Sequence, residues 1–525
     1  MMTRLWNPGA WKWSKSLIGR SKALASGVED IDICLIVEGT YPYVAGGVSG
    51  WVHELIQSLP EFRFHLLTLL APNQKLQTRY EIPANVHGIT HVTLAPPQGK
   101  LGHRELPVAL FAALEQGLYQ FQEEGGLPAL RQIIATLAPY ERRLDPGWLL
   151  NSKPAWELLL KLYERLLPGG PFLDFFWTWR YLAGNLFTIL LADLPKAKTY
   201  HSLSTGYAGL FLARARLETH RPVIVCEHGI YTNERRIEIT MADWLYEDPH
   251  AGLQLEGHRN DCRKLWIHAF QAYSKACYQA CDQIITIYGG NQDFQKADGA
   301  DPEKMRVIPN GIAWRRFENL VSDKGSRPPT IALIGRVVPI KDIKGFIQAC
   351  AILRHAVPTA MALVMGPTEE DEGYYEECMG LIHHFRLQEM VVFTGRVNLV
   401  DYLGKIDVLV LTSISEGQPL VILEAGAAGV PTVATDVGAC REMILGMATE
   451  DPPLGPGGAV TRVSNPSETA QELARLLTQP SWWQQCSQAI RQRVKTYYDQ
   501  DTLTQTYREI YTGLCQCPTS RLDEV

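Results

Sequence analysis

The sequence lacks any apolar run of the 18 or more residues that a membrane-spanning helix requires. It also lacks an excess of either charge, since its 525 residues include 50 Lys and Arg against 56 Asp and Glu, for a net charge of −6. A chain that binds nucleic acid through its overall charge is strongly basic, so this class is excluded. No apolar h-region follows the N-terminal charges, and we therefore predict no secretory signal peptide.

The 11 cysteines include no Cys-x-x-Cys pair and are scattered along the chain. Some of them, such as Cys34 and Cys226, lie inside apolar runs, where cysteine behaves as a small buried hydrophobe. Cys277 and Cys281 lie four residues apart, but no partner cluster stands at zinc spacing. We therefore predict no metal and no cofactor, and a reduced, cytoplasmic chain that is at most peripheral at the inner membrane face.

Residues 1–28 carry five basic residues, three tryptophans and no acidic residue. This N-terminal arm is either poorly ordered, or packed on the body of the protein, or in weak contact with an anionic membrane surface. We favour an arm without a membrane role, and its function stays open.

Alternating strand and helix patterns predict an α/β fold. The apolar run at 31–37 is followed by a Gly-bearing loop, a helical pattern and a second apolar run at 63–70, which is a βαβ unit with buried parallel strands. Residues 97–195 interrupt this alternation with Leu-rich and aromatic helical patterns, which predict a helical insertion. Its aromatic stripe either packs on its own domain or anchors a partner; the stripe comprises Phe172, Phe175, Phe176 and Trp179.

The chain divides into two such series. A polar segment with Gly and a Pro pair, 318–329, predicts a linker between an N-terminal domain, 29–317, and a C-terminal domain, 330–490. We expect residues 491–525 to form a helix that returns to the first domain. The predicted fold is two Rossmann-like, doubly wound domains that face a cleft, in which ligands sit beyond the carboxyl ends of the strands.

Two cations follow the first strand of the second domain. Arg336 ends the run TIALIGR and Lys341 comes five residues later. Both can neutralise a diphosphate, Arg through paired hydrogen bonds and Lys as a point charge. A departing diphosphate gains negative charge, so these cations would also lower the barrier. The alternative is a pair of surface cations on a loop.

The segment SEGQPLVILEAG follows a later strand of the same domain. Glu416 and Glu424 are separated by seven residues, Gly417 permits close approach of a ligand, and Pro419 suits the first turn of a helix. Free N–H groups and the positive end of the helix dipole would bind phosphate there; the donors are Gln418, Leu420 and Val421. Glu424 suits ribose hydroxyls and Glu416 a sugar. Two incidental glutamates on an amphipathic helix are the alternative, but an unpaired carboxylate in an apolar run is costly to bury.

This segment resembles the Glu-x7-Glu motif of retaining glycosyltransferases of family four (GT4), which have the GT-B fold. The stretches at 307–312, 335–341 and 429–444 are similar to further motifs of that family in order and spacing. The resemblance implies metal-independent transfer from a UDP-sugar, with catalytic roles for His228, Arg336, Lys341 and Glu416. The Asp-x-Asp string of metal-dependent GT-A enzymes occurs only at 30–32, before a strand rather than after one.

Three segments of the first half, 38–56, 200–210 and 227–238, resemble the branch of that family that builds Pel exopolysaccharide. This implies a hexose or N-acetylhexosamine donor such as UDP-glucose, a growing polysaccharide as acceptor, and inner-membrane Pel-type export proteins as partners. The sequence departs from many members at Gly426, where they have Met, and at Gln418, where they have an aromatic or aliphatic residue.

Several residues of the first domain are candidates for the reacting centre. The loop with Gly46 and Gly47 offers N–H donors to a diphosphate, or is a plain turn. His228 follows a strand and matches a family histidine that contacts the donor sugar, or is a satisfied turn residue. Further candidates for the acceptor or sugar are His201, Glu234 and Arg235, with Arg236 beside them. Retention proceeds by attack on one face, or by double displacement, for which Glu227 stays open as the nucleophile.

Two other functions are compatible with the sequence. One is a catalytically silent UDP-sugar-binding subunit of a membrane polysaccharide-export assembly, which has little reason to keep the complete set of charged residues. The other is a transferase like starch or sucrose synthase. Starch and glycogen synthases carry a Lys before the Gly-Gly loop, whereas Val44 and Ala45 precede it here, which counts against this alternative.

Overall fold

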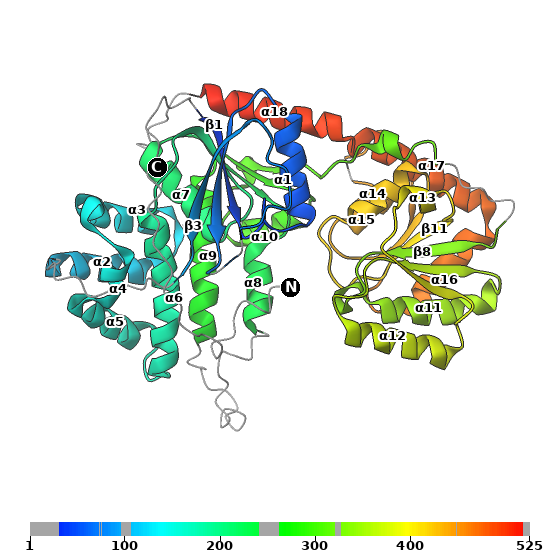
Figure 1. Ribbon diagram of the computed structural model, residues 1–525, viewed down its shortest axis with the longest axis horizontal. Helices are drawn as coiled ribbons and strands as arrows, with labels where there is room; N and C mark the ends of the chain where they lie inside the picture. Colours follow the sequence, from blue (N-terminus) through cyan, green and yellow to red (C-terminus); the bar gives the residue numbers. More distant parts are fainter. Residues whose placement is uncertain are drawn as a thin grey trace. The chain divides into compact units, whose positions relative to one another are not determined.

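The computed structural model describes residues 31–72, 74, 76–95, 107–240, 262–320, 327–447 and 449–517. The chain forms two compact units (Figure 1). The N-terminal unit comprises the described residues up to Ile285, Asp293–Arg306 and those from Arg508 on, and the C-terminal unit comprises Thr286–Gln292 and Val307–Tyr507. The predicted arm at 1–28 lies outside the described residues. In the described chain, no helix is both long and apolar enough to cross a membrane.

The N-terminal unit is built on a seven-stranded sheet in the order β3-β2-β1-β4-β5-β6-β7. The strands are β1 (Ile31–Glu38), β2 (Phe64–Leu70), β3 (Val86–Thr93), β4 (Ala197–Ser202), β5 (Val223–Glu227), β6 (Gln283–Thr286) and β7 (Met305–Val307). β1 pairs in parallel with both β2 and β4, which explains its apolar run, because a central parallel strand is buried on both faces. The connecting helices are α1 (Gly47–Ser58), α7 (Tyr207–Thr219), α8 (Tyr231–Thr240), α9 (Cys262–Ala280) and α10 (Asn291–Ala297).

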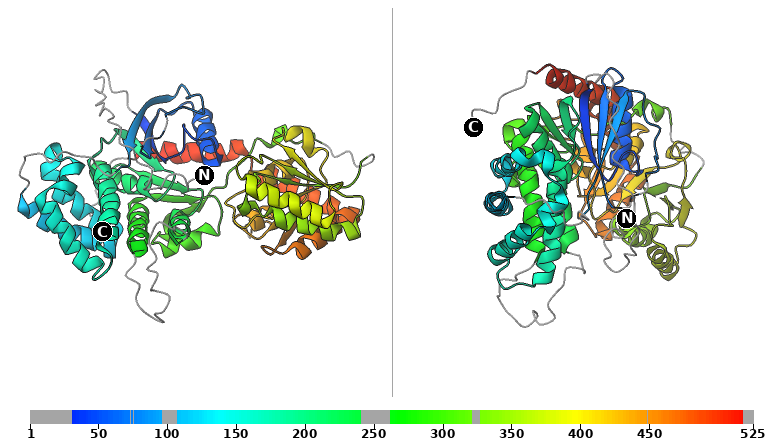
Figure 2. Two further views of the ribbon diagram at one scale, coloured as in Figure 1. Left: turned by 60° about the horizontal axis from the view of Figure 1, so that its bottom comes forward. Right: turned by 60° about the vertical axis from the view of Figure 1, so that its left-hand side comes forward.

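The predicted insertion is a bundle of helices that packs against α9 (Figure 2). It comprises α2 (Val108–Glu123), α3 (Gly126–Leu137), α4 (Pro146–Asn151), α5 (Lys153–Leu166) and α6 (Phe172–Leu191). Phe175 of the aromatic stripe is buried, and the other stripe residues pack partly against the same core. The stripe therefore packs on its own domain, and the exposed apolar side chains of α6 are instead Leu173 and Trp177.

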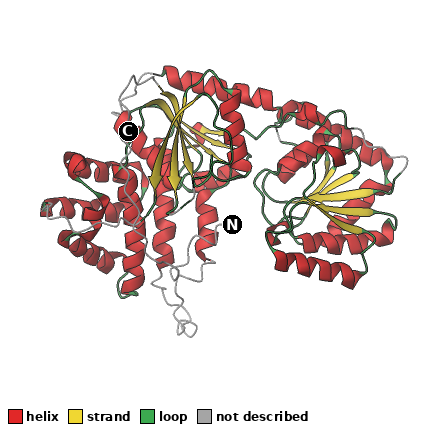
Figure 3. Ribbon diagram, in the orientation of Figure 1, coloured by secondary structure: helices red, strands yellow, loops and turns green. Residues whose placement is uncertain are grey.

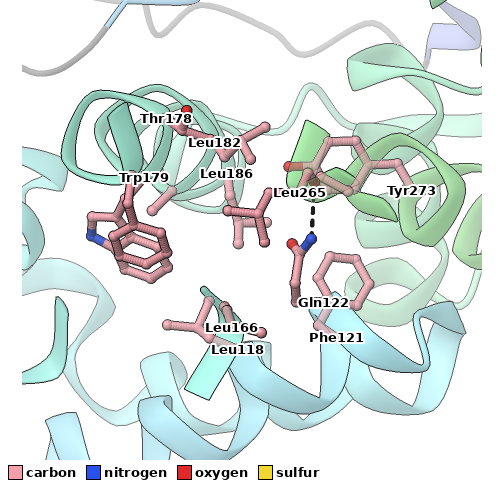
Figure 4. A pocket seen from close by; sticks show the side chains of 13 residues that line it. Leu118, Phe121, Gln122, Leu166, Thr178, Trp179, Leu182, Leu186, Leu265 and Tyr273 are labelled. Atoms are coloured by element: carbon pink, nitrogen blue, oxygen red, sulfur yellow. Dashed lines mark hydrogen bonds between the residues drawn. The ribbon is translucent and has the colours of Figure 1, made fainter. Parts of the chain in front are cut away.

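A cavity of ≈ 40 Å³ lies between α2, α6 and α9 (Figure 4). Its walls are mostly apolar, and the amide of Gln122, one of the lining residues, donates to the carbonyl oxygen of Leu265 at 2.9 Å. None of the predicted site residues lines this cavity, so it belongs to the packing of the insertion.

The C-terminal unit is built on a six-stranded parallel sheet in the order β10-β9-β8-β11-β12-β13. The strands are β8 (Thr330–Ile334), β9 (Met361–Met365), β10 (Val391–Gly395), β11 (Val408–Leu411), β12 (Thr432–Thr435) and β13 (Gly458–Thr461). Helices cover both faces (Figure 3); they are α11 (Ile343–Ala356), α12 (Glu372–Phe385), α13 (Val400–Leu403), α14 (Leu420–Ala427), α15 (Cys440–Leu445), α16 (Pro466–Thr478) and α17 (Pro480–Tyr497). Numbered within its own sheet, each unit begins 3-2-1-4-5-6, the doubly wound order. The predicted fold class of two such α/β domains with a helical insertion in the first is therefore confirmed.

The chain passes between the units at other residues than the sequence predicted. The C-terminal unit begins at Val307 rather than after 317, because Ile312 and Phe317 are buried in its core and the Ile312 N–H donates to the carbonyl oxygen of Tyr498 at 2.9 Å. The return takes place within the last helix, α18 (Gln500–Gln516), which joins the N-terminal unit from Arg508 rather than from 491.

Candidate functional site

The topology of the C-terminal sheet brings its predicted site residues together. β8 and β11 are neighbouring strands at the point where the chain order reverses, and ligands of doubly wound sheets bind beyond the carboxyl ends of such strands. Lys341 follows β8, and Glu416 follows β11. The Lys341 ammonium donates to Glu416 Oε1 at 2.5 Å, and both side chains are largely buried, with 19% and 12% exposed.

The same Glu416 oxygen accepts a second hydrogen bond, from Ser413 Oγ at 2.5 Å. Ser413 is a site residue that the sequence analysis missed, although its place directly after a buried strand was the available signal. A carboxylate with one charged and one neutral donor on the same oxygen has a well-defined position. The structure thus assembles a cation, a carboxylate and a hydroxyl at the sheet edge.

The loop that carries Lys341 is held by the end of β11. Thr412 Oγ1 donates to the carbonyl oxygens of Lys341 and Asp342, at 3.0 and 2.9 Å. The N–H of Ile414 donates to the carbonyl oxygen of Ile340 at 2.8 Å. These bonds fix the Lys341 loop against the strand that leads to Glu416, so the short ion pair follows from the backbone arrangement.

A second loop, after β12, supports Glu416 from the other side. Gly438 has a φ of +53°, and a Cβ atom there would lie 2.2 Å from the carbonyl oxygen of Glu416 and 2.3 Å from that of Gly417. The N–H of Ala439 donates to the Gly417 carbonyl oxygen at 2.8 Å. Thr435 Oγ1 donates to the carbonyl oxygen of Ser413 at 2.6 Å. Only glycine meets both the conformation and the close approach at position 438.

Helix α14 begins at Leu420, with Pro419 as its N-cap, one residue outside the first turn where the sequence analysis placed it. The change has no cost, since proline contributes no N–H group at either position. The N–H groups of Leu420 and Val421 lie in the first turn, where a helix offers no internal acceptor. Glu424 is half-buried one turn further along. The helix start therefore presents donors and its positive dipole end, as predicted for an anion site.

The side chain of Gln418 binds the backbone of Asn310, near the start of the C-terminal unit, and not the start of helix α14. Its Oε1 accepts from the N–H of Asn310 at 2.7 Å, and its Nε2 donates to the carbonyl oxygen of Asn310 at 3.1 Å. This reciprocal pair ties the segment that begins the C-terminal unit to the residue before α14. The sequence analysis had assigned Gln418 only a backbone donor role.

Arg336 is not part of the Lys341–Glu416 pair. Its guanidinium lies 2.9 Å from Glu370 Oε2, with 51% and 33% of the two side chains exposed. Glu370 directly precedes Asp371, the N-cap of α12, whose side chain accepts from the N–H of Tyr374 at 2.9 Å. An exposed ion pair contributes about 0–1 kcal/mol, so Arg336 can exchange this partner for an anionic ligand at little cost.

In the N-terminal unit, Gly46 and Gly47 precede and begin helix α1. The Gly46 N–H donates to the Tyr80 hydroxyl at 3.4 Å. A Cβ atom at either glycine would meet nothing within 4 Å, and neither residue has a φ in the left-handed region. Packing within the unit therefore does not require glycine at these positions, and the room beside their backbone is compatible with a ligand.

His228 follows β5 and is half-buried. The ring of Trp51, from α1, lies 4.7 Å from its ring at an interplanar angle of 69°. Its Nε2 atom is buried and has no hydrogen-bond partner in the described part of the chain. Burial lowers the pKa of His228 to about 4, so the imidazole is neutral at pH 7. A neutral ring with an uncommitted nitrogen fits the role that the sequence suggested.

His201 does not fit the predicted role of contacting the acceptor or sugar. The residue is fully buried at the end of β4, and its Nδ1 lies 2.7 Å from the hydroxyl of Tyr511 in α18. Burial lowers its pKa to about 3, with His228 as a second cause. His201 is enclosed because β4 is a central strand and α18 covers its end.

Glu227, the open candidate for a nucleophile, is also enclosed. It is fully buried and accepts hydrogen bonds from the Tyr278 hydroxyl at 2.6 Å, Gln295 Nε2 at 2.9 Å and Thr205 Oγ1 at 3.1 Å. Burial raises the pKa of Glu227 to about 7. With three partners inside the unit, this carboxylate has a structural role.

The candidate residues on α8, which are Glu234, Arg235 and Arg236, lie near the carboxylate of Glu38. Arg235 pairs with Glu238 at 2.7 Å and lies over the Tyr231 ring, 4.9 Å from its centroid. The Tyr231 hydroxyl donates to Glu38 Oε1 at 2.7 Å, and burial raises the pKa of Glu38. Glu234 is exposed beside them, and Arg236 donates to Asn233. The sequence analysis missed Glu38, although it is the last residue of β1.

Among the described residues, no group of three or more His, Cys, Asp or Glu side chains is placed to hold a metal ion. Asp32 of the Asp-x-Asp string accepts from the N–H of Arg63 at 3.0 Å and from Lys198 at 2.8 Å, which are contacts within the fold. The absence of a metal in the function stays a prediction.

Two family models match the chain. Residues 31–303, more than half of the chain, match the model described as a domain of unknown function, DUF3492. Residues 328–479 match the model described as glycosyl transferases group 1.

The chain is similar to several characterised proteins. It is 25% identical to the MMP α-(1→4)-mannosyltransferase of Mycolicibacterium hassiacum over 271 residues, 49% of this chain and 57% of that protein. It is 23% identical to a glycogen synthase of Mycobacterium tuberculosis over 249 residues, 47% and 56% of the two chains. The similarity to the D-inositol 3-phosphate glycosyltransferase of Nocardiopsis dassonvillei is 24% over 365 residues, 65% and 78%. The alignments with the first two span little more than half of those proteins.

Solved structures show the same fold over most of their length. The sucrose-phosphate synthase of Thermosynechococcus elongatus matches with a TM-score of 0.54 and 15% identity, over 92% of this chain and 98% of that one. Anabaena HepE in complex with UDP matches with a TM-score of 0.54 and 13% identity, over 91% and 99%. At these identities the likeness concerns the fold alone, which is GT-B.

Proposed function

The chain belongs to the DUF3492 family, and its residues 328–479 match the model of the group 1 glycosyl transferases; from this premise we propose that it is a retaining glycosyltransferase. It transfers a hexose or N-acetylhexosamine from a UDP-sugar to a growing polysaccharide. The observation that carries the proposal is the Lys341–Glu416–Ser413 cluster at the β8/β11 sheet edge, in the unit whose helix α14 presents a free N-terminal turn.

The proposal assigns the donor to the C-terminal unit. The N–H groups of Leu420 and Val421 bind the diphosphate together with the dipole of α14, and Lys341 neutralises its charge. Glu416 accepts from hydroxyls of the sugar and Glu424 from those of the ribose. Anabaena HepE, which shares the fold, was crystallised with UDP and with UDP and glucose, and this supports a uridine nucleotide as the ligand.

In the proposed reaction, the acceptor hydroxyl oxygen bonds to the anomeric carbon while the bond from that carbon to the β-phosphate oxygen breaks. The bonding electrons leave with UDP, and the hydroxyl proton passes to a diphosphate oxygen on the same face, so the configuration is retained. Charge grows on the diphosphate during this step, and Lys341, Arg336 and the α14 N–H groups stabilise it. The burial of Glu227 counts against a double displacement through that residue.

The N-terminal unit supplies the remaining groups in this proposal. The Gly46–Gly47 N–H groups contact the diphosphate, and neutral His228 hydrogen-bonds the sugar where charge develops. The resemblance of segments 38–56, 200–210 and 227–238 to PelF supports a Pel-like exopolysaccharide as acceptor, inner-membrane export proteins as partners and a cytoplasmic site of action.

Titration calorimetry with UDP, followed by turnover of UDP-glucose and UDP-N-acetylgalactosamine, tests the proposal. We expect UDP to bind, and Lys341→Ala to weaken binding by about 10- to 100-fold, because a charged hydrogen bond contributes about 1.5–3 kcal/mol. Lys344→Ala is the matched control, since Lys344 pairs with Glu377 at the start of α11 and outside the cluster. Failure of the parent protein to bind UDP at millimolar concentration would overturn the proposal, and binding without any turnover would indicate a silent binding subunit instead.

A further inference from the structure

Four aromatic side chains from separate elements meet at the end of the N-terminal sheet. This cluster, which we call the aromatic relay, comprises Trp51 of α1, His201 of β4, His228 after β5 and Tyr511 of α18. The Trp51 ring lies 4.7 Å from the ring of His228 and 6.4 Å from that of His201. The His201 ring lies 5.8 Å from that of Tyr511, and their Nδ1 and hydroxyl oxygen are 2.7 Å apart.

We infer that Trp51 is a positioning residue for His228, and that Tyr511 of the last helix holds Trp51 in place through His201. The inference rests on the proposed function, because it concerns the residue that we assign to the sugar. Helix α18 carries no sequence motif that points to catalysis, and the inference gives it a role in positioning the residues of the N-terminal site.

Packing is what orients the His228 ring. No hydrogen bond to this ring occurs among the described residues, and its Nε2 is buried without a partner. The ring contact found for it is the T-shaped one with Trp51, which is the geometry that aromatic rings prefer. A ring without hydrogen bonds turns when its packing neighbour moves, so the direction of the His228 nitrogens depends on Trp51.

The far end of the relay is rigid. Tyr511 is fully buried, and its ring also packs against Phe62 at 5.7 Å and Phe64 at 6.2 Å. His201 is fully buried between Tyr511 and Trp51. Trp51 lies four residues after Gly47 on the same helix. The relay therefore fixes the helix that begins at the Gly46–Gly47 loop relative to His228, and so sets two proposed substrate contacts together.

The relay also shields the Nε2 atom of the His228 imidazole from water. Among the residues that the structure describes, the titratable groups that face His228 are His201 from β4 and, behind it, Tyr511 from α18, while Glu234 of α8 lies beside the neighbouring Gly229. Burial lowers the pKa of His228 to about 4. A smaller side chain at position 51 would admit water, and the pKa of His228 would then rise toward the ordinary value of about 6.5.

Trp51→Leu and Tyr511→Phe test the inference in the full chain. We expect UDP affinity to fall by a smaller factor than kcat, because most of the groups assigned to UDP belong to the C-terminal unit and only the Gly46–Gly47 N–H groups lie on the helix that carries Trp51. The kcat should fall by about 10- to 100-fold in Trp51→Leu, as for a misplaced catalytic group, and by a smaller factor in Tyr511→Phe. The acid limb of the pH–rate profile should shift to higher pH in Trp51→Leu, because the pKa of His228 rises.

Tyr200→Phe is the matched control. Tyr200 is a buried tyrosine next to His201 on β4, but its side chain points to the opposite face and its hydroxyl donates to the Pro195 carbonyl oxygen at 2.9 Å. It should keep the kcat and pH profile of the parent. The inference is overturned if Trp51→Leu and Tyr511→Phe fold and keep the kcat and the pH profile of the parent protein. If Trp51→Leu does not fold, Trp51→Phe takes its place in the experiment.

A readout that needs no turnover separates this inference from the proposed function. NMR titration of protein labelled with 15N-histidine follows the pKa of His228 directly. A higher pKa in Trp51→Leu than in the parent supports the relay even if the parent transfers no sugar. An unchanged pKa refutes it even if the parent binds UDP and turns over.

Discussion

Replacing Gly438 by alanine is expected to displace the loop that carries Glu416. The new Cβ would lie 2.2 Å from the Glu416 carbonyl oxygen, whereas ordinary contacts begin at 3.4 Å. The atoms in the way belong to the backbone, so the loop must retreat by roughly 1 Å rather than rotate a side chain. The φ of +53° adds strain of about 1–2 kcal/mol for a residue with a Cβ.

Strain and clash together are expected to lower the free energy of unfolding by about 2–5 kcal/mol, since forced overpacking costs about 1–3 kcal/mol by itself. The displaced loop carries Glu416, and its Gly417 carbonyl oxygen accepts from the N–H of Ala439. Because Glu416 would move with this loop, turnover of the UDP-sugar should fall by about 100-fold. Urea unfolding gives the first quantity, and release of UDP from the UDP-sugar in the presence of acceptor gives the second.

Gly455→Ala separates strain from clash. Gly455 has a φ of +81°, but a Cβ there meets nothing within 4 Å. This control should lose about 1–2 kcal/mol of stability and keep full turnover. If Gly438→Ala behaves like Gly455→Ala in both assays, the 438 loop does not support Glu416 and the reasoning is refuted.

Gly47→Ala and Gly50→Ala should unfold at or slightly above the parent temperature, because both glycines lie in α1, a Cβ there meets nothing, and Ala favours a helix over Gly by about 0.5–1 kcal/mol. Only Gly47→Ala should weaken UDP-sugar turnover, and equal turnover in both variants would show that no ligand approaches Gly47. Gln418→Leu should lower the urea midpoint by an amount equivalent to about 1–3 kcal/mol, because two hydrogen bonds to the Asn310 backbone are lost, and an unchanged midpoint would show that this pair contributes nothing. Glu227 has a folded pKa of about 7, above its unfolded value of about 4.3, so its contribution to stability is present below about pH 4 and is lost as pH rises through about 7. Urea unfolding between pH 5 and 8 should therefore show a loss of about 3 kcal/mol that Glu227→Gln lacks, and equal slopes in both proteins would refute the shift.

The sequence predicted the site best where a residue directly follows a buried strand. Lys341 and Glu416 are 75 residues apart, but each comes after a strand of the alternating pattern, and parallel strands end at one edge of the sheet. That topology alone brings the two side chains within reach. The Gly438 loop was also recognisable as a motif, but the reason for its glycine is a carbonyl group that only the folded chain places there.

The partners of these residues were not predictable in the same way. Gln418 bonds Asn310, 108 residues away, and His201 bonds Tyr511, 310 residues away. Neither pair involves two strand ends, so no topological rule connects them. The domain boundary was misplaced for the same reason, because residues 307–317 look like the end of the first series but Ile312 and Phe317 bury their side chains in the second.

The two sheets carry different chemistry at the same topological place. In the C-terminal sheet the ends of β8 and β11 hold Lys341 and Glu416. The equivalent strands of the N-terminal sheet, β1 and β4, end in Glu38, which accepts from Tyr231 and Ala208, and near His201, which pairs with Tyr511. Those hydrogen bonds occupy both strand ends with contacts of the fold itself. The next strand, β5, is followed by His228, which is only half-buried and has no hydrogen bond in the described chain, whereas His201 is fully buried and bonded to Tyr511; for this reason the chemistry of the N-terminal unit is expected at His228 and not at His201.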